Sequence, residues 1–129
     1  MNTNHSELTV ITKSKDLCSY VITITQKSPK QFRFTFVSRM QNLSLDVIEY
    51  LYIANDTFVM KGDTAAWRQR LEFQHKAMTS LKLLSYFSLL ALENKCIIQR
   101  QYEQISRQSV ECMNLLGGWI NSDKRRLQS

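Results

Sequence analysis

The residues of this chain that could carry out chemistry are few and widely separated. Neither histidine, His5 or His75, has a cysteine or carboxylate at metal-ligand spacing, which argues against a metal site. The adjacent glycines lack the other members of a phosphate-binding loop, and no serine or cysteine stands in a nucleophile motif. Asp46 and Glu49, three residues apart, fit a solvated helical surface better than an acid–base dyad. We therefore expect a protein that is not an enzyme and has no cofactor or metal.

The cysteines and the apolar runs indicate where the protein works. Cys18, Cys96 and Cys112 are odd in number, widely spaced and without a Cys-x-x-Cys pair. This pattern favours free, buried thiols in a reducing compartment over a disulfide framework or a zinc site. The polar N-terminus has no apolar signal core, and no apolar run approaches the roughly 18 residues that a membrane span needs. We therefore expect a cytoplasmic protein with no membrane segment.

Basic side chains dominate the charge. The chain has 17 Lys and Arg against 11 Asp and Glu, a net charge of +6. Such an excess of positive charge gives information about binding partners and not about the fold. It fits either ordinary solubility or binding to a polyanion such as nucleic acid. No acid lies between Leu17 and Leu45, but four cations do: Lys27, Lys30, Arg33 and Arg39. These four are candidate nucleic-acid-binding residues.

Two further patterns bear on nucleic acid. Phenylalanines alternate with the cations at three positions: Phe32, Phe34 and Phe36. Such interleaving suits phosphate contact with base stacking, but we favour the alternative that the phenylalanines begin a core stripe and the cations are merely solvated. Later in the chain, basic side chains recur every seven residues: Arg68, His75 and Lys82. On a helix they form a stripe about 20 Å long, and a symmetric oligomer would repeat it into a large positive surface.

The elements that must position these side chains are predicted to be helices. With one proline and three glycines, the chain has few breakers, which favours long helices in one domain over residues 1–129. Apolar residues at helical spacing and short connections predict an all-α, antiparallel up-down four-helix bundle. The helices are expected near residues 8–27, 32–55, 64–94 and 97–120, with frayed tails at 1–7 and 121–129.

Each of the last three helices has a predicted core stripe. The second helix has Val37, Met40, Val47, Ile48, Leu51 and Ala54. The third has Trp67, Leu71, Met78, Leu81 and Leu92. The fourth has Ile98, Tyr102, Ile105, Cys112, Leu116 and Trp119. The first 34 residues are ambiguous, because Leu17, Tyr20, Val21 and Ile24 have helical spacing while residues 20–25 are rich in β-branched side chains that favour a strand. An N-terminal hairpin therefore stays open beside a helix, and Pro29 separates the first two elements in either case.

The third helix has a second apolar side. Over residues 83–92 apolar side chains go all the way round the helix, so every side must be covered. We interpret four of them as a subunit interface: Leu83, Tyr86, Phe87 and Leu90. The alternative is central burial within a single bundle.

Two segments resemble a known family. SPKQFRFTFVSRMQNLSLDVIEYLYIAND, at 28–56, is similar to the opening of the second helix in a bacterial four-helix-bundle family. That family includes the accessory variability determinant of diversity-generating retroelements and the protein encoded in intervening sequences of the large ribosomal RNA. The ending LLGGWI, at 115–120, looks more like the retroelement branch, and residues 43–52 lack the stretch typical of the ribosomal branch.

The resemblance implies four helices, a homopentameric barrel and a basic surface. It also implies association with a reverse transcriptase and its template RNA, and it matches Lys30, Arg33 and Arg39 to basic residues around the start of the second helix. On this basis we expect a non-catalytic accessory subunit that binds RNA and DNA and supports mutagenic cDNA synthesis. The alternative is a structural or interaction bundle of the ribosomal intervening-sequence type, whose basic charge is incidental.

Overall fold

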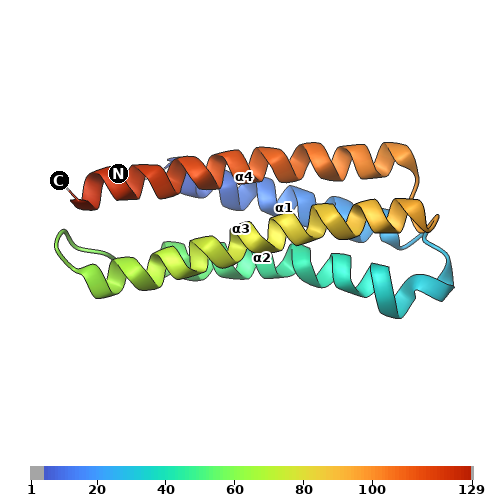
Figure 1. Ribbon diagram of the computed structural model, residues 1–129, viewed down its shortest axis with the longest axis horizontal. Coiled ribbons are helices and arrows are strands. Elements are labelled where there is room, and N and C mark those ends of the chain that lie inside the picture. Colours follow the sequence, from blue (N-terminus) through green and yellow to red (C-terminus); the bar gives the residue numbers. More distant parts are fainter. Residues whose placement is uncertain (1–4, 129) are drawn as a thin grey trace.

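The computed structural model describes residues 5–128, and it describes side chains over 9–127. Four long helices lie along one axis (Figure 1). They are α1 (His5–Thr25), α2 (Ser38–Asp56), α3 (Thr64–Glu93) and α4 (Gln99–Gln128). A 3₁₀ turn, Lys30–Phe32, and a π-helical segment, Arg33–Val37, lead into α2. Because residues 5–128 contain no strand, the prediction of an all-α fold with four helices is confirmed.

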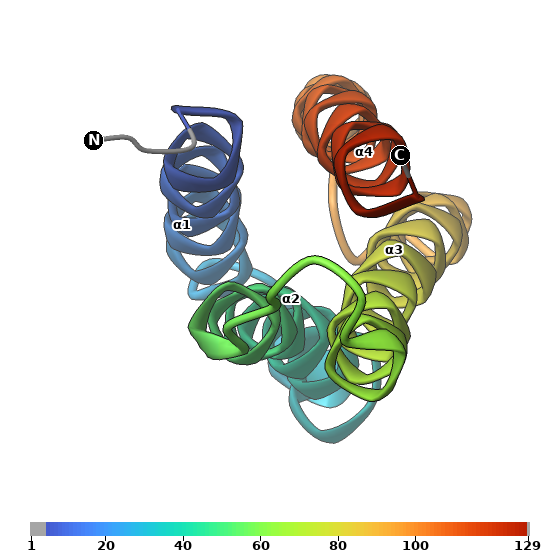
Figure 2. The same cartoon turned by 90° about the vertical axis from the view of Figure 1, so that its left-hand side faces the viewer.

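The helices surround one core. Seen end-on, they follow one another around it in the order α1, α2, α3, α4, and α4 packs back against α1 (Figure 2). The α1–α2 and α3–α4 connections lie at one end, whereas the α2–α3 loop lies at the other, with the start of α1 and the finish of α4 (Figure 1). At the first end, the hydroxyl of Ser28 donates a hydrogen bond of 2.9 Å to the Cys96 carbonyl and so joins the two connections.

The ambiguous N-terminal segment is a helix, so the hairpin alternative is wrong. Val10, Leu17, Val21 and Ile24 repeat at intervals of three, four and seven residues, and all are buried in the core. Burying this face against α2 and α4 outweighs the strand preference of the β-branched residues, which is a weak and context-dependent effect. As predicted, Pro29 lies between the first two elements.

The core stripe of α2 is largely as predicted, but that of α3 is displaced. In α2 and the turn before it, five of the six predicted residues are buried and Ile48 is half-buried. In α3, the predicted Trp67, Leu71, Met78 and Leu92 are only half-buried. The buried face is instead made of Arg70, Gln74, Ala77, Ser80, Leu81, Leu84, Ser88 and Ala91. The prediction followed the large apolar residues, whereas the core takes small and polar ones. The Ser88 hydroxyl donates locally to the Leu84 carbonyl at 2.7 Å, while Arg70 and Gln74 both bond to Asp123 of α4.

Both predicted helix limits in the tails need correction. α4 continues through Gln128, so residues 121–128 are helix and not a frayed tail. α1 begins at His5, so residues 5–7 are helical as well, while residues 1–4 and 129 lie outside the described residues. At the other end of α4, Ile98 precedes the helix and is exposed, although it was predicted to lie in the core stripe.

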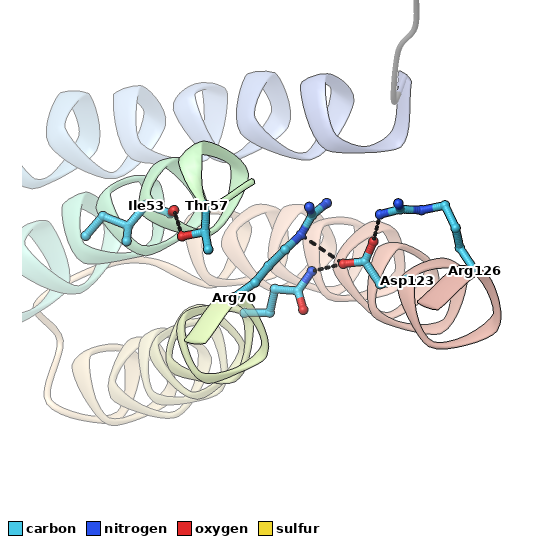
Figure 3. Close-up of polar contacts among 6 residues, drawn as sticks. Ile53, Thr57, Arg70, Asp123 and Arg126 are labelled. Atoms are coloured by element: carbon cyan, nitrogen blue, oxygen red, sulfur yellow. Dashed lines mark hydrogen bonds and ion pairs between the residues drawn. The ribbon is translucent and has the colours of Figure 1, made fainter. Parts of the chain in front are cut away.

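A buried polar cluster explains why α4 is so long. Asp123 forms an ion pair of 2.9 Å with Arg70 of α3, and its other oxygen accepts a 2.9 Å hydrogen bond from Arg126 (Figure 3). The amide of Gln74 donates to Asp123 at 3.1 Å. Leu127, one turn further, is buried as well. The last turns of α4 are therefore anchored to α3.

Two further expectations can be compared with the structure. Cys18, Cys96 and Cys112 are free and buried, as predicted. Within residues 5–128, no helix has the length and apolar character needed to cross a membrane.

Candidate nucleic-acid interface

All of the predicted basic site residues are on the surface. Every one of them is exposed: Lys27, Lys30, Arg33, Arg39, Arg68, His75 and Lys82. The structure divides them into two groups. The first four lie in the connection between α1 and α2 or in the first turn of α2, while the last three lie along α3. A single chain therefore presents two basic regions and not one continuous site.

The turn between α1 and α2 encloses a hollow of about 530 Å³. Its lining includes the cations Lys30 and Arg33 and the ring of Phe34. The remaining lining residues are mostly polar: Thr25, Gln26, Ser28, Pro29, Val37, Ser38 and Gln41. One hydrogen bond, from the amide of Gln41 to the hydroxyl of Thr25 at 2.9 Å, ties α2 to the end of α1 beside the hollow. We call this feature the turn hollow.

The charges of the turn hollow are all of one sign. No acidic residue lines it, and within the described part of the chain neither Lys30 nor Arg33 forms an ion pair. Lys95 in the α3–α4 connection and Arg100 in the first turn of α4 are also exposed, and this connection lies at the same end of the bundle (Figure 1). A concave surface lined by cations attracts anions more strongly than the same charges spread over a flat surface.

The stripe on α3 is more mixed. Glu72 lies between Arg68 and His75 in the sequence. Its carboxylate forms an ion pair of 3.3 Å with Lys76. Lys76 also lies 4.8 Å from the centroid of the Phe73 ring, which holds its ammonium group against the bundle. Arg68, His75 and Lys82 are the exposed basic side chains of the stripe.

The predicted interface residues form a partly exposed apolar surface. Tyr86 is 60% exposed and Leu83 is 38% exposed, so these two are not centrally buried within one bundle. Phe87 and Leu90 are half-buried and line a second hollow of about 290 Å³ with Phe34, Thr35, Phe36 and Arg39. The guanidinium of Arg39 lies 4.9 Å from the centroid of the Phe87 ring. A predicted nucleic-acid residue and a predicted interface residue are therefore in contact.

The alternating phenylalanines have different environments. Phe32 and Phe36 pack against the core, with their ring centroids 5.8 Å apart, as the core-stripe interpretation predicts. Phe34 does not follow that interpretation, because it is 86% exposed. Sequence reasoning grouped the three rings together, but residues four apart share one helical face and the residue midway between them points the other way.

Two observations concern metal binding and thiol reactivity. Among the described residues, no group of three or more His, Cys, Asp or Glu side chains is placed to hold a metal ion. Burial raises the pKa of the Cys96 and Cys112 thiols above their usual value of 9.0, which reduces the fraction of reactive thiolate.

Comparison with known proteins identifies a solved structure with a similar fold. No family model matches the chain, and no match to a curated protein was found. Among solved structures, the chain is similar to a protein of unknown function from the S23 ribosomal protein family of Bacteroides thetaiotaomicron VPI-5482. The two share 15% identity with a TM-score of 0.77, over 90% of this chain and 98% of the other. At this identity the likeness establishes a shared small helical bundle and nothing about activity.

Proposed function

We propose that this protein is a non-catalytic, nucleic-acid-binding accessory subunit of a retroelement reverse transcriptase. In this role it would support template-RNA-dependent, mutagenic cDNA synthesis in the cytoplasm. The observation that carries the proposal is the exposure of all seven predicted basic residues on a chain of net charge +6. Unpaired surface cations bind phosphates with a gain from counterion release, and this gain needs no particular base sequence.

Self-assembly is the second part of the proposal. The four helices would form an antiparallel up-down bundle, and copies would pack through Leu83, Tyr86, Phe87 and Leu90 into a homopentamer. The support from the structure is the exposed apolar surface, because monomeric proteins seldom leave such side chains clustered in water. The stoichiometry of five rests on the resemblance to the bacterial four-helix-bundle family. Assembly would repeat the two basic regions around a symmetry axis.

This chain is basic, and its proposed partner, the reverse transcriptase, is expected to be basic as well. Reverse transcriptases act on long anionic templates and are usually basic, so a basic partner gains little by meeting the enzyme alone. A shared RNA offsets this repulsion, because counterions are released from both proteins. We therefore propose a ternary complex in which RNA tightens the pair. Locally acidic patches such as Asp46 and Glu49 offer an alternative point of contact.

Co-purification tests this proposal. A tagged copy of the chain is expressed in its natural host and purified with and without nuclease treatment. We expect a reverse transcriptase and its template RNA to be recovered together, with less enzyme after nuclease. Recovery of neither, in either condition, combined with no reverse transcriptase gene nearby, would reject the proposal.

The likeness to a protein of the S23 ribosomal protein family supports a second candidate. In this candidate the chain is a structural or interaction bundle of the ribosomal intervening-sequence type, and its basic charge is incidental. The two candidates differ in the gene neighbourhood and in affinity for RNA. An adjacent reverse transcriptase with a variable repeat favours the first, whereas no RNA binding at 50 mM salt favours the second.

A further inference from the structure

Phe34 has an unusual position for a large apolar side chain. It is 86% exposed, although its neighbours Phe32 and Phe36 pack against the core. The segment that carries it, Arg33–Val37, is π-helical, and such segments frequently occur at functional sites. A single exposed apolar residue is normal on a protein surface, so exposure alone assigns no role to Phe34. Its surroundings supply the second observation.

Phe34 lines the turn hollow together with Lys30 and Arg33. These cations have no acid within the hollow, and hydroxyl and amide groups from Ser38 and Gln41 complete its wall. One concave surface therefore combines an accessible aromatic face with positive charge and neutral hydrogen-bonding groups. Proteins that bind single-stranded nucleic acid combine the same two elements, because cations hold the phosphates while bases stack on rings.

We propose that the turn hollow is a binding site for single-stranded nucleic acid. This inference rests on the proposed function and specifies the form of its ligand. A backbone phosphate lies against Lys30 and Arg33, and an adjacent base stacks on the ring of Phe34. A duplex fits the site less well, because its bases are already stacked on one another and their faces are closed to Phe34.

A contact between subunits is the competing use of Phe34, since its ring also lines the hollow formed with Phe87 and Leu90. Lys30 and Arg33 line the turn hollow and not this second hollow, so a copy that also covers the turn-hollow side of Phe34 would bury them as well. Those cations would then need carboxylates from the incoming copy, because the wall of the turn hollow has none. Phosphates supply the required negative charge directly, so the observations favour nucleic acid.

The test uses short oligonucleotides of about six residues with the full-length protein. Affinity is measured for an oligothymidine, for an abasic oligomer of equal length and for a duplex. Phe34→Ala should weaken oligothymidine binding about five- to a hundredfold, the range expected for loss of one stacked base. The abasic oligomer should bind Phe34→Ala and wild type equally. The matched control is Phe58→Ala, which removes another highly exposed ring from the loop between α2 and α3 and should leave affinity unchanged.

Charge variants test the phosphate contact separately. Lys30→Gln with Arg33→Gln should reduce the slope of log affinity against log salt by about 0.7, the contribution of the one single-strand phosphate that both cations contact. Lys124→Gln with Arg125→Gln makes the same change in charge on exposed residues near the end of α4, and it should alter the slope much less. In addition, the tryptophan fluorescence of Phe34→Trp should be quenched by oligothymidine and not by the abasic oligomer.

The outcomes separate the inference from the proposed function. If wild type binds none of the nucleic acids at 50 mM salt, the proposed function fails and the inference fails with it. If wild type binds but Phe34→Ala and the Lys30 and Arg33 variant behave like their controls, only the inference is overturned. If Phe34→Ala instead dissociates the assembly in light scattering, Phe34 is a subunit contact and the inference is also overturned.

Discussion

The guanidinium of Arg70 lies 2.9 Å from the carboxylate of Asp123, so that two charged side chains meet inside the bundle. Their exposed fractions are only 6% and 2%. Gln74 and Arg126 bring two more donors to the same carboxylate, and the Arg70 guanidinium stands 5.0 Å from the centroid of the Trp119 ring. Removing charges from water is costly, and only such dense pairing offsets the cost. The cluster therefore holds the end of α4 against α3.

Asp123→Asn should destabilise the protein strongly. The change removes the carboxylate charge that pairs with Arg70 at 2.9 Å, and breaking a buried pair in this way costs about 3 kcal/mol or more. The free energy of unfolding is measured by urea denaturation. The control is Glu111→Gln, which removes an exposed pair with Lys13 at 3.5 Å and should cost less than about 1 kcal/mol. Equal effects of the two variants would show that the buried cluster does not anchor α4.

The fold was predictable where apolar residues repeat at helical spacing, and it was not where polar residues are buried. The stripes of α2 and α4 are made largely of side chains such as Leu51 and Leu116, so their burial follows from hydrophobic pattern alone. Arg70 and Asp123 are buried where they pair with each other, across 53 residues of sequence. No local pattern reveals such a partner, and for that reason the buried face of α3 and the last turns of α4 were missed.

The buried thiols predict a stability that depends on pH. Burial raises the pKa of Cys96 and Cys112 in the folded protein, so the unfolded chain ionises first as the pH rises. Stability from these thiols is therefore complete below pH 9.0 and is lost as the pH rises above it, at up to about 1.4 kcal/mol per pH unit for each thiol. Urea denaturation at several pH values measures this loss. The Cys96→Ala, Cys112→Ala variant should show a smaller loss, and an unchanged pH dependence would contradict the prediction.

The oligomeric state tests the apolar surface of α3. Light scattering after size exclusion should give about five times 15.1 kDa for the wild type. Leu83→Glu with Phe87→Glu should dissociate the assembly, because burying unpaired carboxylates costs several kcal/mol. Tyr86→Glu, at the most exposed of these positions, should do the same without disturbing the core.

A control variant tests whether added negative charge by itself dissociates the assembly. Leu45 and Tyr52 are exposed on α2 and are not among the predicted interface residues, so their replacement by glutamate should leave the assembly intact. Circular dichroism confirms that each variant keeps its helices. A wild-type monomer at micromolar concentration would show that the apolar surface is not a subunit interface.

The sequence predicted which residue types form the candidate site, but it did not predict how they are arranged in space. The absence of acids between Leu17 and Leu45 correctly located exposed cations at the α1–α2 turn. The turn hollow, however, is built on a 3₁₀ turn followed by a π-helical segment, and sequence spacing did not predict either element. The contact of Arg39 with Phe87 depends on the packing of α2 against α3, which sequence spacing does not encode.

The dependence of RNA binding on salt tests the central claim most directly. The assembly should bind RNA and DNA with little sequence preference, and six or more phosphate contacts should cost roughly a thousandfold in affinity between 50 and 200 mM salt. Arg68→Glu with Lys82→Glu should weaken binding without unfolding the protein, since both side chains are exposed on α3. Binding that is independent of salt, or no binding at 50 mM salt, would contradict a nucleic-acid-binding function.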